Sequence, residues 1–258
     1  ASLNMRILSV YGISGTGKTT TIENIIAELR KRKYSVGSIK DIHFQDFALD
    51  TEGTNTDRHR KAGAELVTAW GLDETDILYQ RKLALDQILK HYHHDFVIIE
   101  GLAKGNFPRI LTAANIEEID ERINDTVIAL SGKISNKINT YQGIPVINSL
   151  SEVEKLVDLI EEKVFTRLPD FPPECCSACG YSCQELAVKI IKGEASREDC
   201  IISDTNIKLT IDGQEIEMVP FVQKILYNTV KGVVSELKGY QPGSTIEIKI
   251  GEDYEPEN

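Results

Sequence analysis

One eight-residue motif constrains the fold of this chain more than any other feature of its sequence. Residues 12–19 read Gly-Ile-Ser-Gly-Thr-Gly-Lys-Thr, which fits the pattern G-x-x-x-x-G-K-[ST] of a phosphate-binding P-loop. An apolar, strand-like run at residues 6–11 precedes the motif, and a helical pattern begins near Lys18. A chance glycine-rich turn rarely sits between a strand and a helix in this way. The motif therefore predicts an α/β domain that binds a nucleotide.

A P-loop works through its backbone and through two of its side chains. The backbone N–H groups curl around a phosphate, and the N-terminus of the following helix adds positive potential. We expect Lys18 to reach the β- and γ-phosphates and Thr19 to hold Mg²⁺. The residues of this segment predicted to bind the nucleotide are Gly12, Ser14, Gly15, Thr16, Gly17, Lys18, Thr19 and Thr20.

A second apolar run, residues 96–100, ends in a carboxylate and is followed by Gly101. A strand that ends in this way has the form of a Walker B element, whose carboxylate orients the Mg²⁺ shell or a water molecule. Acidic strand ends are common, but one that accompanies a P-loop carries more weight. Glu100 is therefore predicted to act with Thr19 on Mg²⁺ and with Lys18 in catalysis.

Residues 40–64 form a long polar segment after a predicted strand end. If it faces the P-loop, its charged side chains would grip nucleotide phosphates or a second phosphorylated ligand, and a solvated loop is the alternative. We assign Lys40 and Asp50 to the nucleotide site as candidates. The chain has no Asn-Lys-x-Asp sequence of the kind that reads guanine, so spacing leaves GTP and ATP open.

Strand-like and helical patterns alternate as far as about residue 168. The strand candidates are residues 6–11, 36–39, 64–70, 96–100, 126–130 and 145–147. This alternation predicts an α/β fold, a P-loop NTPase-like, mostly parallel sheet with helices on both faces. Residues 168–174 contain three prolines, so this segment cannot form a helix and we place a domain boundary there. We therefore expect the nucleotide-binding domain to comprise residues 1–168.

All five cysteines lie between Cys175 and Cys200. A disulfide-stabilised secreted protein would spread an even number of cysteines along its length, so this cluster indicates a metal site within residues 169–203. Beyond it, residues 207–211 alternate, Asp212-Gly213 indicates a hairpin turn, Pro220 opens a helical pattern, and Ile246, Ile248 and Ile250 alternate again. Residues 204–258 are thus predicted to form a small ββαβ module, which makes the C-terminal part α+β.

Charge limits the partners that are expected. The chain has 29 Lys and Arg against 40 Asp and Glu, a formal net charge of −11. Such a balance repels nucleic acid and anionic membranes. The chain also lacks an apolar window of the ~18–20 residues that a spanning helix needs. We expect a cytoplasmic protein with neither nucleic-acid nor membrane partners.

The nucleotide-site segments together resemble a known family. The P-loop, the segment with Lys40, His43, Asp50 and Gly53, the Arg60-Lys61-Ala-Gly-Ala run and residues 97–101 are similar to MobB, the adapter family of molybdopterin-guanine dinucleotide biosynthesis. The resemblance covers roughly residues 5–165 and implies a GTP-binding dimer, at most a weak GTPase, that assists the guanylyltransferase joining GMP to molybdopterin. Asp41 and Asn55 depart from the family, which usually has His and Asp there. Both departures would change polar contacts in this segment.

The cysteines resemble a second family, the Fe–S domain of electron-transfer subunits such as those of the Rnf complex and of carbon monoxide dehydrogenase–corrinoid proteins. Cys176, Cys179, Cys183 and Cys200 match its ligands, with three residues instead of the usual four between Cys179 and Cys183. Three thiolates from one loop and a fourth returned by a helix suit a [4Fe–4S] cluster. Zinc is the main alternative, although structural Cys₄ zinc usually takes two separated Cys-x-x-Cys pairs. Cys175 is a fifth thiol that could replace Cys176.

These observations leave three functions open. The first is a GTP-binding accessory protein of molybdenum or tungsten cofactor biosynthesis, which predicts association with the guanylyltransferase or a molybdopterin enzyme. The second is a nucleotide-gated electron-transfer or metallocluster-assembly protein, which predicts cluster chemistry coupled to the nucleotide. The third is a scaffold with structural zinc, which predicts no hydrolysis.

Overall fold

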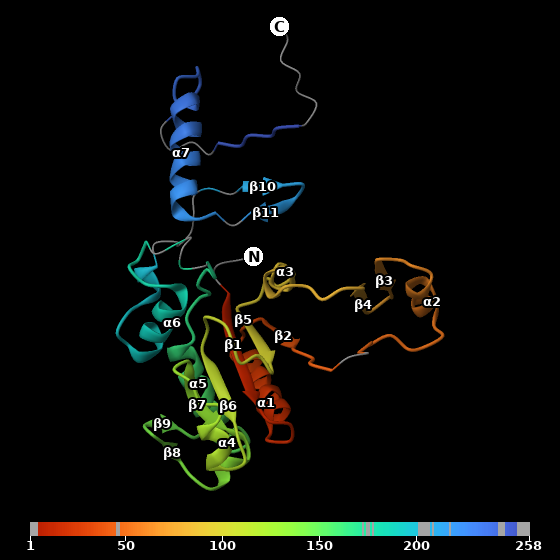
Figure 1. The fold of residues 1–258 in the computed structure, drawn as a ribbon, viewed down its shortest axis with the longest axis vertical. Helices are drawn as coiled ribbons and strands as arrows, with labels where there is room; N and C mark the ends of the chain where they lie inside the picture. Colours follow the sequence, from red (N-terminus) through yellow and green to blue (C-terminus); the bar gives the residue numbers. More distant parts are fainter. Residues whose placement is uncertain are drawn as a thin grey trace. The chain divides into compact units, whose positions relative to one another are not determined.

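A five-stranded parallel sheet forms the centre of the first part of the chain (Figure 1). The computed structural model describes residues 5–44, 47–171, 173, 176, 178–200, 207, 209–216, 218–241 and 246–251. It divides the chain into two units, residues 1–203 and 204–258. The strands of the main sheet lie in the order β2 (Val36–Lys40), β5 (Phe96–Glu100), β1 (Arg6–Gly12), β6 (Arg109–Thr112) and β7 (Val127–Ser131).

Strand register brings the chemical groups to one edge of this sheet. Val10 of β1 pairs with Glu100 of β5, Lys40 of β2 pairs with the same Glu100, and Gly12 pairs with Thr112 of β6. All of these strands run parallel, so their carboxyl ends meet at a single edge, where ligands of open α/β sheets bind.

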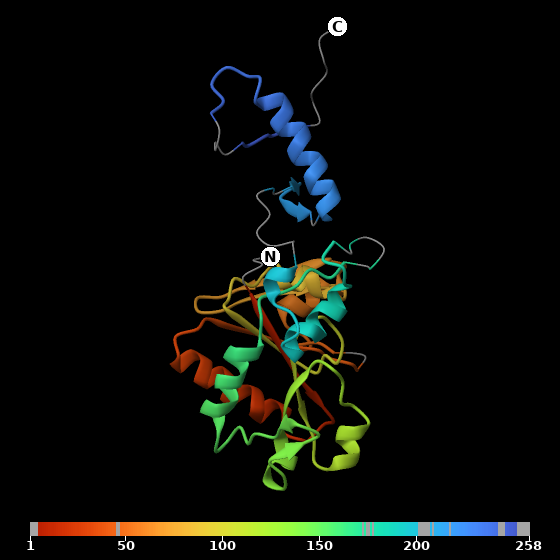
Figure 2. The same cartoon turned by 90° about the vertical axis from the view of Figure 1, so that its left-hand side faces the viewer.

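Helices cover both faces of the sheet, as the sequence predicts. Helices α1 (Lys18–Lys31) and α5 (Val153–Lys163) lie side by side on one face (Figure 2). Helices α3 (Leu85–Leu89) and α4 (Ile116–Asp120) cover the other face. The alternation of β1 explains the two layers, because Leu8 and Val10 pack with α1 and α5 whereas Ile7 packs with α3.

Two of the predicted strands do not belong to the main sheet, and one of its strands was missed. Residues 66–70 form β3 (Leu66–Trp70), which pairs antiparallel with β4 (Thr75–Tyr79) in a separate two-stranded sheet. The run 145–147 is divided: β9 (Ile144–Pro145) pairs with β8 (Thr140–Tyr141), and Val146 bridges to β7. The central strand β6 was missed because its four buried residues are too few to produce a periodic signal.

Residues 47–79, which comprise most of the polar segment and the hairpin after it, form what we call the arm. Helix α2 (Asn55–Lys61) contacts β3, and β3 pairs with β4, so these three elements pack mainly on one another (Figure 1).

The 3₁₀ helix η1 (Gly132–Asn136) follows β7 and contacts both β6 and β7.

The cysteine-bearing segment is part of the first unit. Helix α6 (Cys183–Lys192) contributes Ile191 to the hydrophobic cluster that contains α1 and α5. Its other buried residues, Leu186 and Ala187, form a smaller cluster with Leu168 and Cys200, which follows the 3₁₀ helix η2 (Arg197–Asp199). Phe165 contacts both clusters, so the two are continuous.

The second unit contains a hairpin and a helix. Strands β10 (Leu209–Ile211) and β11 (Gln214–Ile216) pair around the predicted Asp212-Gly213 turn, and α7 (Pro220–Val234) follows. The predicted last strand is wrong for the part that the structure describes, because residues 246–251 carry no strand there. An alternating pattern produces a strand only where a neighbouring strand supplies hydrogen bonds. None of the helices described is long and apolar enough to cross a membrane.

Candidate functional site

The P-loop joins β1 to α1 in a conformation that needs glycine. Gly12 has a φ of 148°, and a Cβ atom there would lie 2.1 Å from the carbonyl oxygen of Thr112. Gly17, at the N-cap of α1, is left-handed with a φ of 107°. Ser14 and Gly15 are exposed at the tip of the loop, and Thr20 is exposed in the first turn of α1. The loop therefore presents its backbone and the start of a helix to solvent, which suits an anion.

Lys18 is folded back over the loop. Its Nζ donates hydrogen bonds to the carbonyl oxygens of Gly12, at 2.9 Å, and Ile13, at 2.7 Å. Burial lowers the pKa of Lys18, whereas the carboxylate of Glu100 raises it and Lys40 lowers it further. To bind a phosphate, the ammonium group must exchange the two carbonyls for phosphate oxygens.

Glu100 is the centre of a small polar group beside the P-loop. Thr19 Oγ1 donates a hydrogen bond to Glu100 Oε1 at 3.3 Å, and Lys40 Nζ lies 3.5 Å from the same oxygen. The Glu100 side chain is 14% exposed, whereas that of Lys40 is 62% exposed. A hydroxyl and a carboxylate this close are oxygen ligands of the kind that Mg²⁺ prefers. The structure thus brings together four of the predicted residues, Lys18, Thr19, Lys40 and Glu100.

Two neighbouring strand ends support the loop, and sequence reasoning missed both. Thr16 Oγ1 donates to the Ile13 carbonyl at 2.8 Å and lies 2.8 Å from Thr112 Oγ1, at the end of β6. The Lys133 N–H donates to the Thr16 carbonyl at 3.0 Å. Gly132 packs so closely that a Cβ atom there would lie 2.2 Å from the Thr16 carbonyl oxygen. The one available signal was Gly132-Lys133, which a single residue separates from the predicted strand of residues 126–130.

Asp50 does not join these residues. Its Oδ1 accepts hydrogen bonds from Thr54 Oγ1 at 2.8 Å and Thr56 Oγ1 at 2.9 Å, at the start of α2. Its described partners thus lie within the arm. A second carboxylate of the arm, Asp57, is buried, and its hydrogen bonds from Lys61, Arg60 and the Gly53 N–H hold its pKa well below the usual range. Asp50 and Asp57 therefore stabilise the fold of the arm itself.

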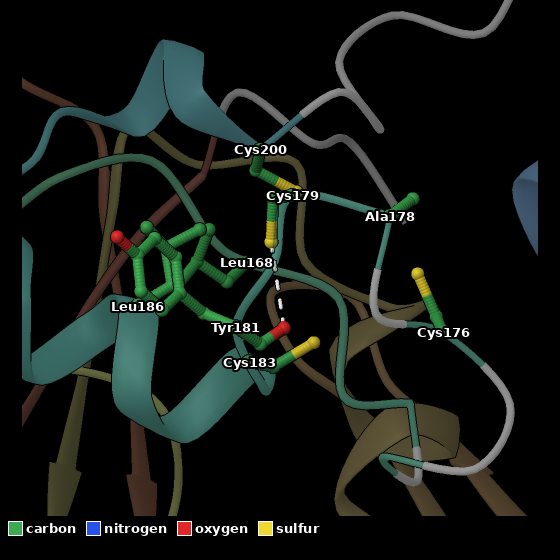
Figure 3. A pocket seen from close by; sticks show the side chains of 8 residues that line it. All are labelled: Leu168, Cys176, Ala178, Cys179, Tyr181, Cys183, Leu186 and Cys200. Carbon is green, nitrogen blue, oxygen red and sulfur yellow. Dashed lines mark hydrogen bonds between the residues drawn. The ribbon is translucent and has the colours of Figure 1, made fainter.

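The four predicted cysteine ligands line one small pocket (Figure 3). Leu168, Ala178, Tyr181 and Leu186 complete its wall. Cys176 and Cys179 come from the loop before α6, Cys183 is the first residue of α6, and Cys200 follows η2. No disulfide joins any two of them. Cys175 lies outside the described residues.

The chemistry of this pocket fits a thiolate-bound metal group, although its present geometry does not enclose one. Soft sulfur donors in an apolar setting suit Fe–S clusters or zinc. Among the described residues, no three His, Cys, Asp or Glu side chains converge closely enough to hold an ion. The Cys179 thiol instead donates to the Tyr181 carbonyl at 3.4 Å, and burial raises the pKa of Cys183. Binding would therefore require the thiols to deprotonate and turn inward.

Two family models match the chain. Residues 7–132 match the family described as "Molybdopterin guanine dinucleotide synthesis protein B", MobB. Residues 172–202 match the family described as "Putative Fe-S cluster". The first range contains the P-loop and Glu100, and the second contains all five cysteines.

Similar proteins extend the first match over more of the chain. A "Putative molybdopterin-guanine dinucleotide biosynthesis adapter protein" of Methanocaldococcus jannaschii is 30% identical over 249 residues, 95% of this chain and 97% of that protein. A probable adapter of the same description from Bacillus subtilis is 26% identical over 147 residues, 55% of this chain and 85% of that protein. The crystal structure of Bacillus subtilis MobB superposes with a TM-score of 0.54 at 24% identity, over 63% of this chain and 99% of that one.

Proposed function

Because this chain belongs to the MobB family of molybdopterin-guanine dinucleotide biosynthesis adapters, we propose that it binds GTP with Mg²⁺ and assists the enzyme that joins GMP to molybdopterin. The predicted resemblance to that family is confirmed. The adapter role is that of the family, whereas the nucleotide, the metal group and the partner enzyme are our proposals.

The observation that carries the proposal is the group formed by Lys18, Thr19, Lys40 and Glu100 around an exposed P-loop. Backbone N–H groups and Lys18 bind the phosphates, while Thr19 and Glu100 hold Mg²⁺. Lys40 lies 3.5 Å from Glu100 and adds a second cation beside the phosphates. We propose GTP rather than ATP as the nucleotide because the chain belongs to a family of molybdopterin-guanine dinucleotide biosynthesis. Hydrolysis by the chain alone is slow, because its motifs include no arginine finger.

The four cysteines hold a [4Fe–4S] cluster in this proposal, with zinc as the alternative. They line one pocket with leucine side chains, and an apolar shell limits the access of water to a cluster. The matching family model, described by its Fe–S cluster, supports iron over zinc. Cys176 is the first ligand, because it stands in Cys-x-x-Cys register with Cys179.

We also propose that the protein is a homodimer, with the β3–β4 hairpin as the contact between copies. The hairpin exposes Leu66, Trp70, Ile77 and Tyr79, and Trp70 is 89% exposed. Leu66 stands opposite Tyr79, and Thr68, between Leu66 and Trp70, stands opposite Ile77, so the four apolar side chains share one face of the hairpin. Exposed apolar patches often mark protein–protein contacts. The edges of a two-stranded sheet also offer unpaired backbone groups to a second hairpin.

Calorimetry on protein purified without oxygen, together with iron and sulfide analysis of the same sample, tests the proposal. We expect binding of Mg²⁺-GTP, weaker binding of Mg²⁺-ATP, and about four irons per chain, the number that the cluster type requires. Absence of triphosphate binding would refute the nucleotide site. One zinc per chain without iron would refute the cluster and favour a structural role for the cysteines.

A second function, nucleotide-gated electron transfer or cluster assembly, is favoured by one observation. Ile191 of the cysteine-bearing helix α6 lies in the same hydrophobic cluster as Ile25 and Leu29 of α1, the helix that begins at the P-loop. A reduction potential that changes on nucleotide binding would support this second function. Co-purification with the guanylyltransferase and a potential independent of nucleotide would support the adapter alone.

A further inference from the structure

The loop between β5 and β6 begins beside Glu100 and runs back along the sheet. Gly101 follows Glu100 directly, and Ser9 Oγ of β1 donates to the Leu102 carbonyl at 2.6 Å. Further along, Phe107 is buried in the cluster that contains Met5 and Ile7, at the amino end of β1. Residues 101–107 therefore run from the edge of the sheet that carries the nucleotide site to the amino end of β1, at the opposite edge.

Arg109 fixes the shape of this loop. It is 1% exposed and donates hydrogen bonds to three carbonyl oxygens of the loop, those of Leu102, Gly105 and Phe107, at 3.4, 3.0 and 3.1 Å. Its guanidinium carbon lies 4.8 Å from the centre of the Phe107 ring. A loop held at several points transmits a displacement of one end to the other, whereas a free loop would absorb it.

The far end of the loop contacts the segment that leads to the cysteines. Asn106 Nδ2 donates to Asp170 Oδ1 at 2.7 Å. The next residue, Phe171, packs against the hydrophobic cluster that contains Leu186 and Cys200, which Cys176 and Cys179 also contact. The backbone of Phe171 also lowers the pKa of the Cys183 thiol, against the larger rise that burial causes. Hydrogen bonds to ligand sulfurs are one of the means by which a protein sets the potential of an Fe–S cluster.

We propose that Asn106 and Asp170 are positioning residues that couple the nucleotide site to Cys183. This inference rests on the proposed nucleotide function. In the structure, Glu100 is held by Thr19 and Lys40. If Glu100 and Thr19 held Mg²⁺, the start of the loop would be fixed in a new position, and the Asn106–Asp170 contact would carry the change to Phe171, which packs beside the cysteines. Nucleotide binding would thereby fix Phe171 more firmly against the pocket to which Cys183 belongs.

Hydrogen exchange measured by mass spectrometry tests the coupling in the full chain, purified without oxygen. The peptide of residues 167–174 reports on few amides, because Pro169, Pro172 and Pro173 have none. We expect a saturating, non-hydrolysable Mg²⁺-GTP analogue to slow exchange at Phe171 about fivefold, the lower end of typical couplings between sites.

Three variants assign the effect to the contact. Asn106→Asp places two carboxylates against each other and should abolish the response to nucleotide. The double variant N106D/D170N exchanges the two groups, re-forms the hydrogen bond in reverse, and should restore the response. Asp86→Asn is the matched control: it weakens the 2.8 Å contact of Arg167 with Asp86 of α3, on the same segment but away from Glu100, and should leave the response intact.

Calorimetry on the same samples separates this inference from the proposed function. If the unsubstituted chain binds the nucleotide and exchange at Phe171 does not change, the coupling is wrong and the nucleotide site stands. If it binds no nucleotide, both are wrong. If N106D responds like the unsubstituted chain, or if the swapped double variant does not recover, the coupling does not pass through Asn106 and Asp170.

Discussion

Replacement of Lys18 by alanine is the most direct test of the nucleotide site. In the free protein, Lys18 Nζ is bonded to the carbonyls of Gly12 and Ile13 and lies beside Glu100. The substitution removes a cation that must face the phosphates, and it leaves the backbone nest and the start of α1 in place. The variant should therefore fold normally and lose affinity.

The size of the loss follows from the two states of the ammonium group. A charge-assisted hydrogen bond to phosphate contributes about 2–3 kcal/mol. Binding must first release the two carbonyls, each worth about 0.5 kcal/mol because the ammonium group stays accessible to water. The net contribution is then about 1–2 kcal/mol, which corresponds to a Kd about 5- to 30-fold higher for the variant.

Titration calorimetry with a non-hydrolysable Mg²⁺-GTP analogue measures this change. Lys31→Ala is a matched control, because it removes the same charge from the other end of α1, where Lys31 pairs with Glu28 and Glu154. The 14-residue helix separates the two positions by about 20 Å. We expect K31A to bind like the unsubstituted chain. A K18A variant whose affinity lies within twofold of the control would refute the assigned role of Lys18.

Four further predictions, each tested by substitution, concern other parts of the structure. Gly12→Ala should lower the melting temperature and abolish nucleotide binding, because the added Cβ would lie 2.1 Å from the Thr112 carbonyl oxygen; an unchanged melting curve would contradict the loop geometry. Serine at Cys176, Cys179, Cys183 or Cys200 should remove most of the iron, whereas Cys175→Ser should keep it; the opposite result at positions 175 and 176 would shift the first ligand by one residue. Trp70→Asp should convert the dimer to a monomer in sedimentation experiments, and a variant that stays dimeric would exclude the hairpin as the contact. Tyr11→Phe should lower the free energy of unfolding by about 1–2 kcal/mol at neutral pH, because the hydroxyl donates to the Arg122 carbonyl at 2.6 Å and accepts from Asn124 at 3.1 Å. Burial raises the pKa of Tyr11 from 10.0 to about 12, so its contribution is complete below pH 10 and is lost as the pH rises through 12; denaturant titrations of the two proteins across this window should converge.

The parts of the site that the sequence predicted are those in which chemistry depends on adjacent residues. The P-loop motif fixes the order of glycines, Lys18 and Thr19 within eight positions, and the five-residue strand β5 consists of four apolar residues and Glu100. Both segments carry their structural signal locally. Lys40 followed from its place after a strand, because the carboxyl ends of neighbouring parallel strands meet.

The parts that could not be predicted depend on contacts between distant segments. Thr112, at the end of β6, and Gly132, directly after β7, support the P-loop from about 100 residues further along the chain, and the Gly132-Lys133 pair was the one local signal for them. Asp50 was assigned to the nucleotide because it is polar and follows a strand, yet Thr54 and Thr56 bind it within the arm. A carboxylate that accepts hydrogen bonds from hydroxyl groups at the start of a helix and one that binds a cation near a phosphate look alike in sequence.

The cysteine-bearing segment illustrates the same limit in a different form. The spacing of the cysteines predicts their common pocket, but not that α6 shares a hydrophobic cluster with α1 and α5 through Ile191. Because Phe165 bridges that cluster and the one around Cys200, removal of residues 169–203 would expose the side chains that α6 now covers. The phosphate site and the thiol pocket therefore stand on one folded body. The coupling that we propose would run from Glu100 to the thiol pocket through the loop that Arg109 holds, and the free energy of moving this loop would then be shared by both sites.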